Sequence, residues 1–198
     1  MIGKASGKRK GGEFERDFCK KLSLWWTEGE RDDVFFRTSG SGGRASVRAE
    51  KGKKTSYHYG DITCVPGVDG ETFLDLFMVE LKRGYGKWCI LDILDSKQKI
   101  PIIVNFWKDM ERKIERIIEV DSTIKIEPLL VFQRNYRSEV VVLSFFAWNC
   151  IEDCVGKFKG SVLEVKVNSM RIKMIKLKAF FNWISPKIIK RKILRWDW

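Results

Sequence analysis

The segment Met78-Val79-Glu80-Leu81-Lys82 constrains the fold of this 198-residue chain more than any other feature. Successive side chains of a β-strand point to opposite faces of the sheet. Glu80 and Lys82 would therefore share one face, while Val79 and Leu81 would be buried on the other. The segment predicts a strand that packs on a core through one face and presents an acid and a base on the other.

Helical and β patterns alternate along the chain. Two segments carry apolar side chains at helical spacing: 12–27, through Phe14, Phe18, Leu22 and Trp25, and 105–120, through Phe106, Met110, Ile114 and Ile117. Five segments have the composition of strands: 34–37, 60–65, 71–82, 127–133 and 139–145. This order predicts an α/β fold, with a mixed central β-sheet flanked by helices. After Gly160 the sequence is basic and less regular.

Turn residues at 66–70 predict that segments 60–65 and 71–82 form a β-hairpin. Such a hairpin would place Asp61 beside Glu80. Two neighbouring carboxylates repel each other unless a cation lies between them. Oxygen ligands with open positions suit Mg²⁺, for which Mn²⁺ would substitute, whereas a single histidine, His58, disfavours zinc.

Lys82 would stand about 7 Å beyond Glu80 on the same face of the strand. From there its ammonium could orient an attacking water, help to deprotonate it and offset phosphate charge. Asp61, Glu80 and Lys82 together predict metal-assisted hydrolysis of a phosphodiester. As the one histidine, His58 is an alternative general base.

The net charge of +12 predicts a polyanionic partner, either nucleic acid or an anionic membrane surface. Cations gather in two regions, 37–54 and 166–198. In the first region we expect phosphate contacts from Arg37, Arg44, Arg48, Lys51, Lys53 and Lys54, and Arg16 either binds phosphate or faces solvent. No apolar run is long enough for a membrane span. Residues 1–11 look like a flexible basic arm without the apolar part of a signal peptide, so we expect a cytoplasmic protein.

Four short segments resemble the archaeal-type Holliday junction resolvases of the PD-(D/E)XK nuclease superfamily. These are GGEFERDFCKKL, FFRTSGSGG, YGDI and VELK, within residues 11–82. The resemblance implies a restriction-endonuclease-like fold in which Glu15, Asp61 and Glu80 surround the metal ion. It also implies that Lys82 serves the nucleophile and that Ser39 or Ser41 contacts the scissile region of DNA. Gly60 stands where the family usually has proline.

Some neighbouring residues leave alternatives open. Glu13 and Asp17 flank Glu15 and are better explained as solvated helix charges. Gln98 follows the strand motif at a distance where some nucleases of this superfamily carry a helical glutamine or lysine.

The sequence predicts a nuclease domain over residues 1–160 and a basic C-terminal extension over 161–198, packed on the body or on a second subunit. The expected activity is Mg²⁺-dependent endonucleolytic cleavage of branched DNA, such as Holliday junctions in recombination and repair, by a homodimer. The alternatives are another nuclease of this superfamily, of restriction or replication and repair type, and a non-catalytic DNA-binding protein of the same fold. A peripheral membrane protein is a third, because Trp183, Trp196 and Trp198 stand among cations.

Overall fold

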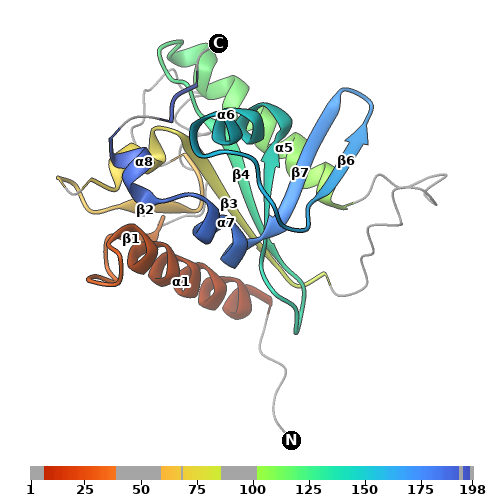
Figure 1. Ribbon diagram of the computed structural model, residues 1–198. Coiled ribbons are helices and arrows are strands. Elements are labelled where there is room, and N and C mark those ends of the chain that lie inside the picture. The colour runs from red at the N-terminus through yellow and green to blue at the C-terminus, as the bar shows by residue number, and fades with distance from the viewer. Residues whose placement is uncertain (1–6, 39–58, 68, 86–101, 192–193, 197–198) are drawn as a thin grey trace, which may run out of the picture.

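The computed structural model describes residues 7–38, 59–67, 69–85, 102–191 and 194–196, with side chains from residue 11 onward. A five-stranded sheet forms its centre, in the order β3-β4-β5-β7-β6 (Figure 1). The strands are β3 (Phe77–Arg83), β4 (Glu127–Gln133), β5 (Val140–Ser144), β6 (Leu163–Val167) and β7 (Met170–Lys176). β3 and β4 are parallel and the other neighbours are antiparallel. The predicted mixed sheet flanked by helices is thus confirmed, and it is consistent with a restriction-endonuclease-like fold.

Helices cover both faces of the sheet (Figure 1). On one face α5 (Ile102–Val120) buries Trp107, Met110 and Ile114 against alternate strand residues such as Met78 and Leu130. The opposite face, which includes Val79 and Leu81, packs on α1 (Gly7–Trp26), α6 (Phe145–Val155) and α7 (Leu177–Trp183). The strand alternation predicted at residues 78–82 therefore separates two cores. Glu80 and Lys82 belong to the face that α5 covers.

The predicted hairpin between segments 60–65 and 71–82 is wrong. β2 (Ile62–Cys64) pairs antiparallel with β1 (Phe35–Arg37), and residues Glu71–Leu74 form a short helix, α3. In α3 both Phe73 and Leu74 are buried, and the Phe73 ring contacts the rings of Trp26 and Phe77. In α3 both side chains face the same core, whereas in a strand these adjacent side chains would point to opposite faces.

The N-terminal helix is longer than predicted. α1 begins at Gly7 rather than at Gly12, so residues 7–11 are not part of a flexible arm. On this helix Trp26 is fully buried, while Trp25 is half-buried and stacks on Phe181.

The expectation of less regular structure after Gly160 is also wrong. β6 and β7 form an antiparallel hairpin, and β7 also pairs with β5 within the main sheet. The chain then continues through α7 and α8 (Pro186–Lys190). Among the described residues from 184 onward, four apolar side chains are buried in the core shared with α1: Ile184, Ile189, Leu194 and Trp196.

Candidate active site

Asp61 links the β1–β2 ladder to the edge strand β3. Its backbone N–H donates to the Val79 carbonyl oxygen at 2.8 Å, and its own carbonyl oxygen accepts from the Thr38 N–H at 2.9 Å. Its side chain turns toward β3, where Oδ2 accepts the N–H of Leu81 at 2.8 Å. These three bonds fix the Asp61 carboxylate beside β3 although no hairpin joins the two strands.

Gly60 allows this close approach. A Cβ built on Gly60 would lie 2.1 Å from the Val79 carbonyl oxygen, which is backbone and cannot turn away. Every side chain other than hydrogen would therefore push Asp61 away from β3. The residue before the aspartate has a steric role here rather than a chemical one.

Glu80 lies at the centre of a cluster of charged side chains. It is only 4% exposed, and each of its oxygens contacts an ammonium group. Lys82 Nζ is 2.5 Å from Oε1, and Lys113 Nζ is 2.9 Å from Oε2. Lys82 Nζ also lies 5.5 Å from the centre of the Phe106 ring, a cation–π contact with α5.

The sequence prediction missed Lys113. The sequence signal that could have indicated Lys113 is its position on α5, three residues after Met110 and directly before Ile114, which are both buried. A lysine at the border of a buried helix face can reach under the helix toward the sheet it covers. Which strand residue it would meet could not be read from the sequence.

The third predicted carboxylate, Glu15, lies on α1 and pairs with Arg37 of β1. Arg37 Nε is 2.9 Å from Glu15 Oε2, a contact with the distance of an ion pair but not the geometry of a hydrogen bond. Burial raises the pKa of the neighbouring Cys19 thiol to about 12, and Glu15 and Asp61 add to this effect. Among the residues that the structure describes, no group of three or more Asp, Glu, His or Cys side chains could hold a metal ion. Glu15 is thus near Asp61 without completing a three-carboxylate set.

The pKa values of Asp61 and Glu80 are shifted in opposite directions. Burial and the Glu80 charge raise the pKa of Asp61 to about 6, against the hydrogen bond from Leu81. Burial also disfavours ionised Glu80, but Lys113 and Lys82 outweigh it and hold the pKa of Glu80 below its ordinary value. Burial alone would lower the pKa of Lys82, yet the two carboxylates raise it. Lys82 is therefore a firmly charged ammonium in this arrangement.

Two of the predicted DNA contacts lie near Glu15. A Cβ on Gly12 would be 3.2 Å from an Arg37 guanidinium nitrogen and 3.7 Å from one of Arg16, so both arginines flank this turn of α1. Both side chains are exposed, as is Asp17, whereas Glu13 is half-buried. Several further predicted positions lie outside the described residues: Ser39, Ser41, Arg44, Arg48, Lys51, Lys53, Lys54, His58 and Gln98.

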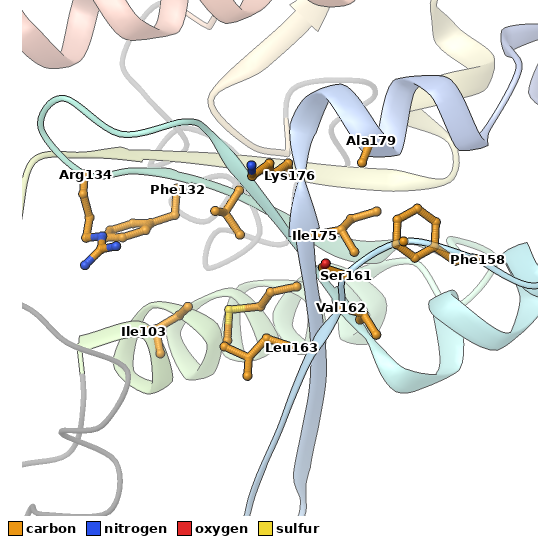
Figure 2. A pocket seen from close by; sticks show the side chains of 13 residues that line it. Ile103, Phe132, Arg134, Phe158, Ser161, Val162, Leu163, Ile175, Lys176 and Ala179 are labelled. Atoms are coloured by element: carbon orange, nitrogen blue, oxygen red, sulfur yellow. The ribbon is translucent and has the colours of Figure 1, made fainter.

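A cavity of about 580 Å³ lies on another part of the sheet (Figure 2). Its lining includes Ile103, Phe132 and Arg134 near one end and Phe158 near the other. Phe132 belongs to an aromatic cluster with Phe106 and the exposed Tyr85, and Phe106 is the ring beneath Lys82. None of the four residues Glu15, Asp61, Glu80 and Lys82 lines this cavity, so it is separate from the carboxylate cluster.

Comparison with known proteins identifies a family. Residues 6–190 match the family described as "Phage putative PDDEXK endonuclease". The chain belongs to this family. No curated protein and no solved structure matches the chain.

Membership of the phage PD-(D/E)XK family confirms the predicted superfamily and supports nuclease activity with DNA as the substrate. Nucleases of this superfamily generally use divalent metal ions. Within the described parts of the chain, no helix is long and apolar enough to cross a membrane.

Proposed function

We propose that this phage-family nuclease is a Mg²⁺-dependent endonuclease that cleaves branched DNA. The observation that carries the proposal is the pair of buried carboxylates, Asp61 and Glu80, on adjacent backbone segments with Lys82 beside them. A protein that only binds DNA gains nothing from two buried carboxylates that face an anionic ligand, because they repel phosphate. In metal-dependent hydrolysis, by contrast, the two carboxylates would bind the cation.

The donor set fits a hard divalent cation. Asp61 and Glu80 offer carboxylate oxygens, and the raised pKa of Asp61 reflects burial and like charge that a cation would relieve. Asp61 and Glu80 would hold Mg²⁺ or Mn²⁺, with Glu15 as a further ligand that must first leave Arg37. When bound, the ion supplies an activated water and charge stabilisation at phosphorus.

The remaining chemistry belongs to side chains of the protein. The Lys82 ammonium orients the attacking water and neutralises charge that builds up on the phosphate oxygens. The water oxygen bonds to phosphorus and gives up a proton to the solvent, one P–O ester bond breaks, and the departing oxygen takes up a proton from the solvent. Arg16 of α1 and Arg37 of β1, both exposed, hold the DNA backbone through phosphate contacts.

Branched DNA is the substrate that resemblance and symmetry favour. A four-way junction must be cut on two opposed strands, and one active site cannot reach both without rebinding. A two-fold homodimer would present two such sites in the symmetry of the junction itself. Contacts to phosphates read backbone geometry, which favours recognition of shape over base sequence.

A cleavage assay with purified protein tests the proposal. Linear, flapped and four-way DNA of the same sequence would be incubated with and without Mg²⁺, with light scattering to measure mass in solution. We expect paired, symmetric cuts on the four-way junction from a dimer. A monomer that cuts linear duplex as readily would leave a general nuclease, and no cleavage of any DNA would leave a binding protein of this fold.

A further inference from the structure

The side chains around Asp61 and Glu80 carry equal numbers of negative and positive charges. Three carboxylates, Glu15, Asp61 and Glu80, gather with three cations, Arg37, Lys82 and Lys113. The two ammonium groups take both oxygens of Glu80, whose side chain is only 6% exposed. A cation that uses Glu80 as a ligand is repelled by both ammonium groups, and the departure of one of them lowers this repulsion.

The two lysines differ in how they are held. Lys82 stands on β3, two residues from Glu80 and on the same face, and its ammonium also contacts the Phe106 ring at 5.5 Å. Lys113 comes from α5 and reaches Glu80 across the space between helix and sheet, 33 residues further along the chain. Both side chains are about equally exposed, 26% for Lys82 and 25% for Lys113. Lys82 is also held by the Asp61 charge and the Phe106 ring, so Lys113, on its flexible stem, is the lysine that moves outward more easily.

We propose that Lys113 is a displaceable counterion of Glu80. Before a metal ion binds, the Lys113 ammonium neutralises the Glu80 charge and holds this side chain in place. When Glu80 becomes a ligand, Lys113 moves from Oε2 to a phosphate oxygen of the bound DNA. The lysine thereby opposes metal binding in the absence of DNA and assists turnover in its presence.

This inference rests on the proposed metal-dependent function, so its test separates the two. The first measurement is Mn²⁺ affinity without DNA, by electron paramagnetic resonance, for wild type, Lys113→Met and Lys113→Arg. Lys108→Met is the control, since it removes one charge from the same helix. We expect Lys113→Met to bind Mn²⁺ roughly tenfold more tightly, which is the scale of one partly buried ion pair, and Lys108→Met to bind as wild type does.

The second measurement is cleavage at saturating Mn²⁺. We expect Lys113→Met to lose about a hundredfold in kcat, the usual cost of one charge-stabilising donor, with partial recovery in Lys113→Arg. Tighter ion binding with slower cleavage is a combination that a purely structural lysine would not produce, because loss of structure weakens both.

The outcomes that overturn the inference are distinct from those that overturn the function. Equal or weaker Mn²⁺ binding by Lys113→Met, with wild type still cleaving DNA, would remove the counterion role and leave the nuclease. Absence of Mn²⁺ binding and of cleavage in every variant would remove both. A thermal melt of each variant confirms that folded proteins are being compared.

Discussion

At the scale of single residues, burial makes the carboxylates of this site sensitive to their partners. Asp61 and Glu80 are each about 5% exposed or less, so neither charge is stabilised by water. Glu80 is ionised because two ammonium groups contact it, whereas Asp61 has a pKa raised to about 6. A substitution at either position therefore changes the charge balance of the whole cluster as well as one ligand.

Neutral isosteres at the three central positions should abolish cleavage. Asp61→Asn, Glu80→Gln and Lys82→Met should each lower kcat by roughly a thousandfold or more, because each removes charge from the reacting centre. Gel cleavage assays would be paired with DNA-binding isotherms, which should change little. Glu13→Gln on α1 is the control and should cleave normally. Near-normal turnover in any of the three central variants would show that the site lies elsewhere.

Gly60→Ala should damage both stability and cleavage although it adds a single methyl group. That carbon would meet the Val79 carbonyl oxygen at 2.1 Å, so either β3 or Asp61 must move. We expect a loss of more than about 2 kcal/mol in the free energy of unfolding. Gly11→Ala is the matched control, since a Cβ there meets nothing within 4 Å and α1 favours alanine. Equal denaturation midpoints for the two variants would contradict the steric role of Gly60.

At the scale of secondary-structure elements, a buried acid at the start of β4 contacts the N-cap of α6. Glu127 begins β4, is 5% exposed, and accepts a hydrogen bond from the Ser144 hydroxyl. The same Ser144 oxygen caps α6 by accepting the Ala147 N–H at 2.9 Å. Burial raises the pKa of Glu127 to about 7, against the bond from Ser144 and with a contribution from Glu111.

The raised pKa of Glu127 predicts a pH-dependent stability. The acid is protonated in the folded protein up to about pH 7 but ionises near pH 4.5 when unfolded. Its contribution is therefore fully present below about pH 4.5 and is lost as the pH rises through 7. Relative to wild type, Glu127→Gln should gain roughly 3 kcal/mol in unfolding free energy between pH 4.5 and 8. Urea titrations of both proteins measure this difference, and parallel pH profiles would contradict it.

The elements that the sequence predicted well are those whose pattern is local. The periodic apolar face of α5 was sufficient to predict this helix, and the β-rich runs of β4 and β5 were sufficient to predict two strands joined by a turn at Arg134 to Arg137. The 71–82 segment was misread because Phe73 and Leu74 are apolar neighbours, a composition that a strand and a helix share. β6 (LEVKV) and β7 (MRIKMIK) alternate apolar and charged residues for most of their length, which is the period of a half-buried strand. They were missed because the basic composition after Gly160 was weighed above this alternation.

The candidate site shows the same division. Glu80 and Lys82 share a face by strand geometry alone, and the structure brings Asp61 to them. The contact itself, however, is a side-chain bond to the Leu81 N–H rather than a hairpin ladder. Lys113 reaches Glu80 across a tertiary contact between α5 and β3. The local sequence of either segment does not predict how the two elements pack on each other. Sequence reasoning thus found the residues of one strand and missed the partner that arrives from a helix.

At the scale of the whole molecule, the net charge of +12 makes DNA binding depend on salt. Each phosphate contact releases counterions, so log K falls by about 0.9 per contact for each tenfold rise in salt. Replacing Arg44, Arg48, Lys51, Lys53 and Lys54 with glutamine should therefore flatten the slope by up to about 4.5. Fluorescence anisotropy across a salt series measures this slope, and an unchanged slope would show that these cations do not touch DNA.

The last prediction concerns whether residues 161–198 can be separated from the rest. β7 lies between β5 and β6, so ending the chain at Gly160 would turn β5 into a bare edge and expose the side chains around it. It would also remove Ile184, Ile189, Leu194 and Trp196 from the core.

We therefore expect residues 1–160 alone not to unfold cooperatively in urea. Deletion of Ser185–Trp198 is the milder test. It removes Ile189, Leu194 and Trp196 from the core, each worth about 1.5–3 kcal/mol. It also removes the bond from the Trp196 indole to the Leu76 carbonyl oxygen at 2.8 Å. That total approaches the free energy of unfolding of a typical domain, about 5–15 kcal/mol, so this variant should be barely folded. Trp196→Phe is the control, because it keeps most of the side-chain volume and should lose far less stability. A cooperative transition for residues 1–160, with the denaturant dependence expected for their size, would instead establish the C-terminal segment as an extension added to a complete nuclease domain.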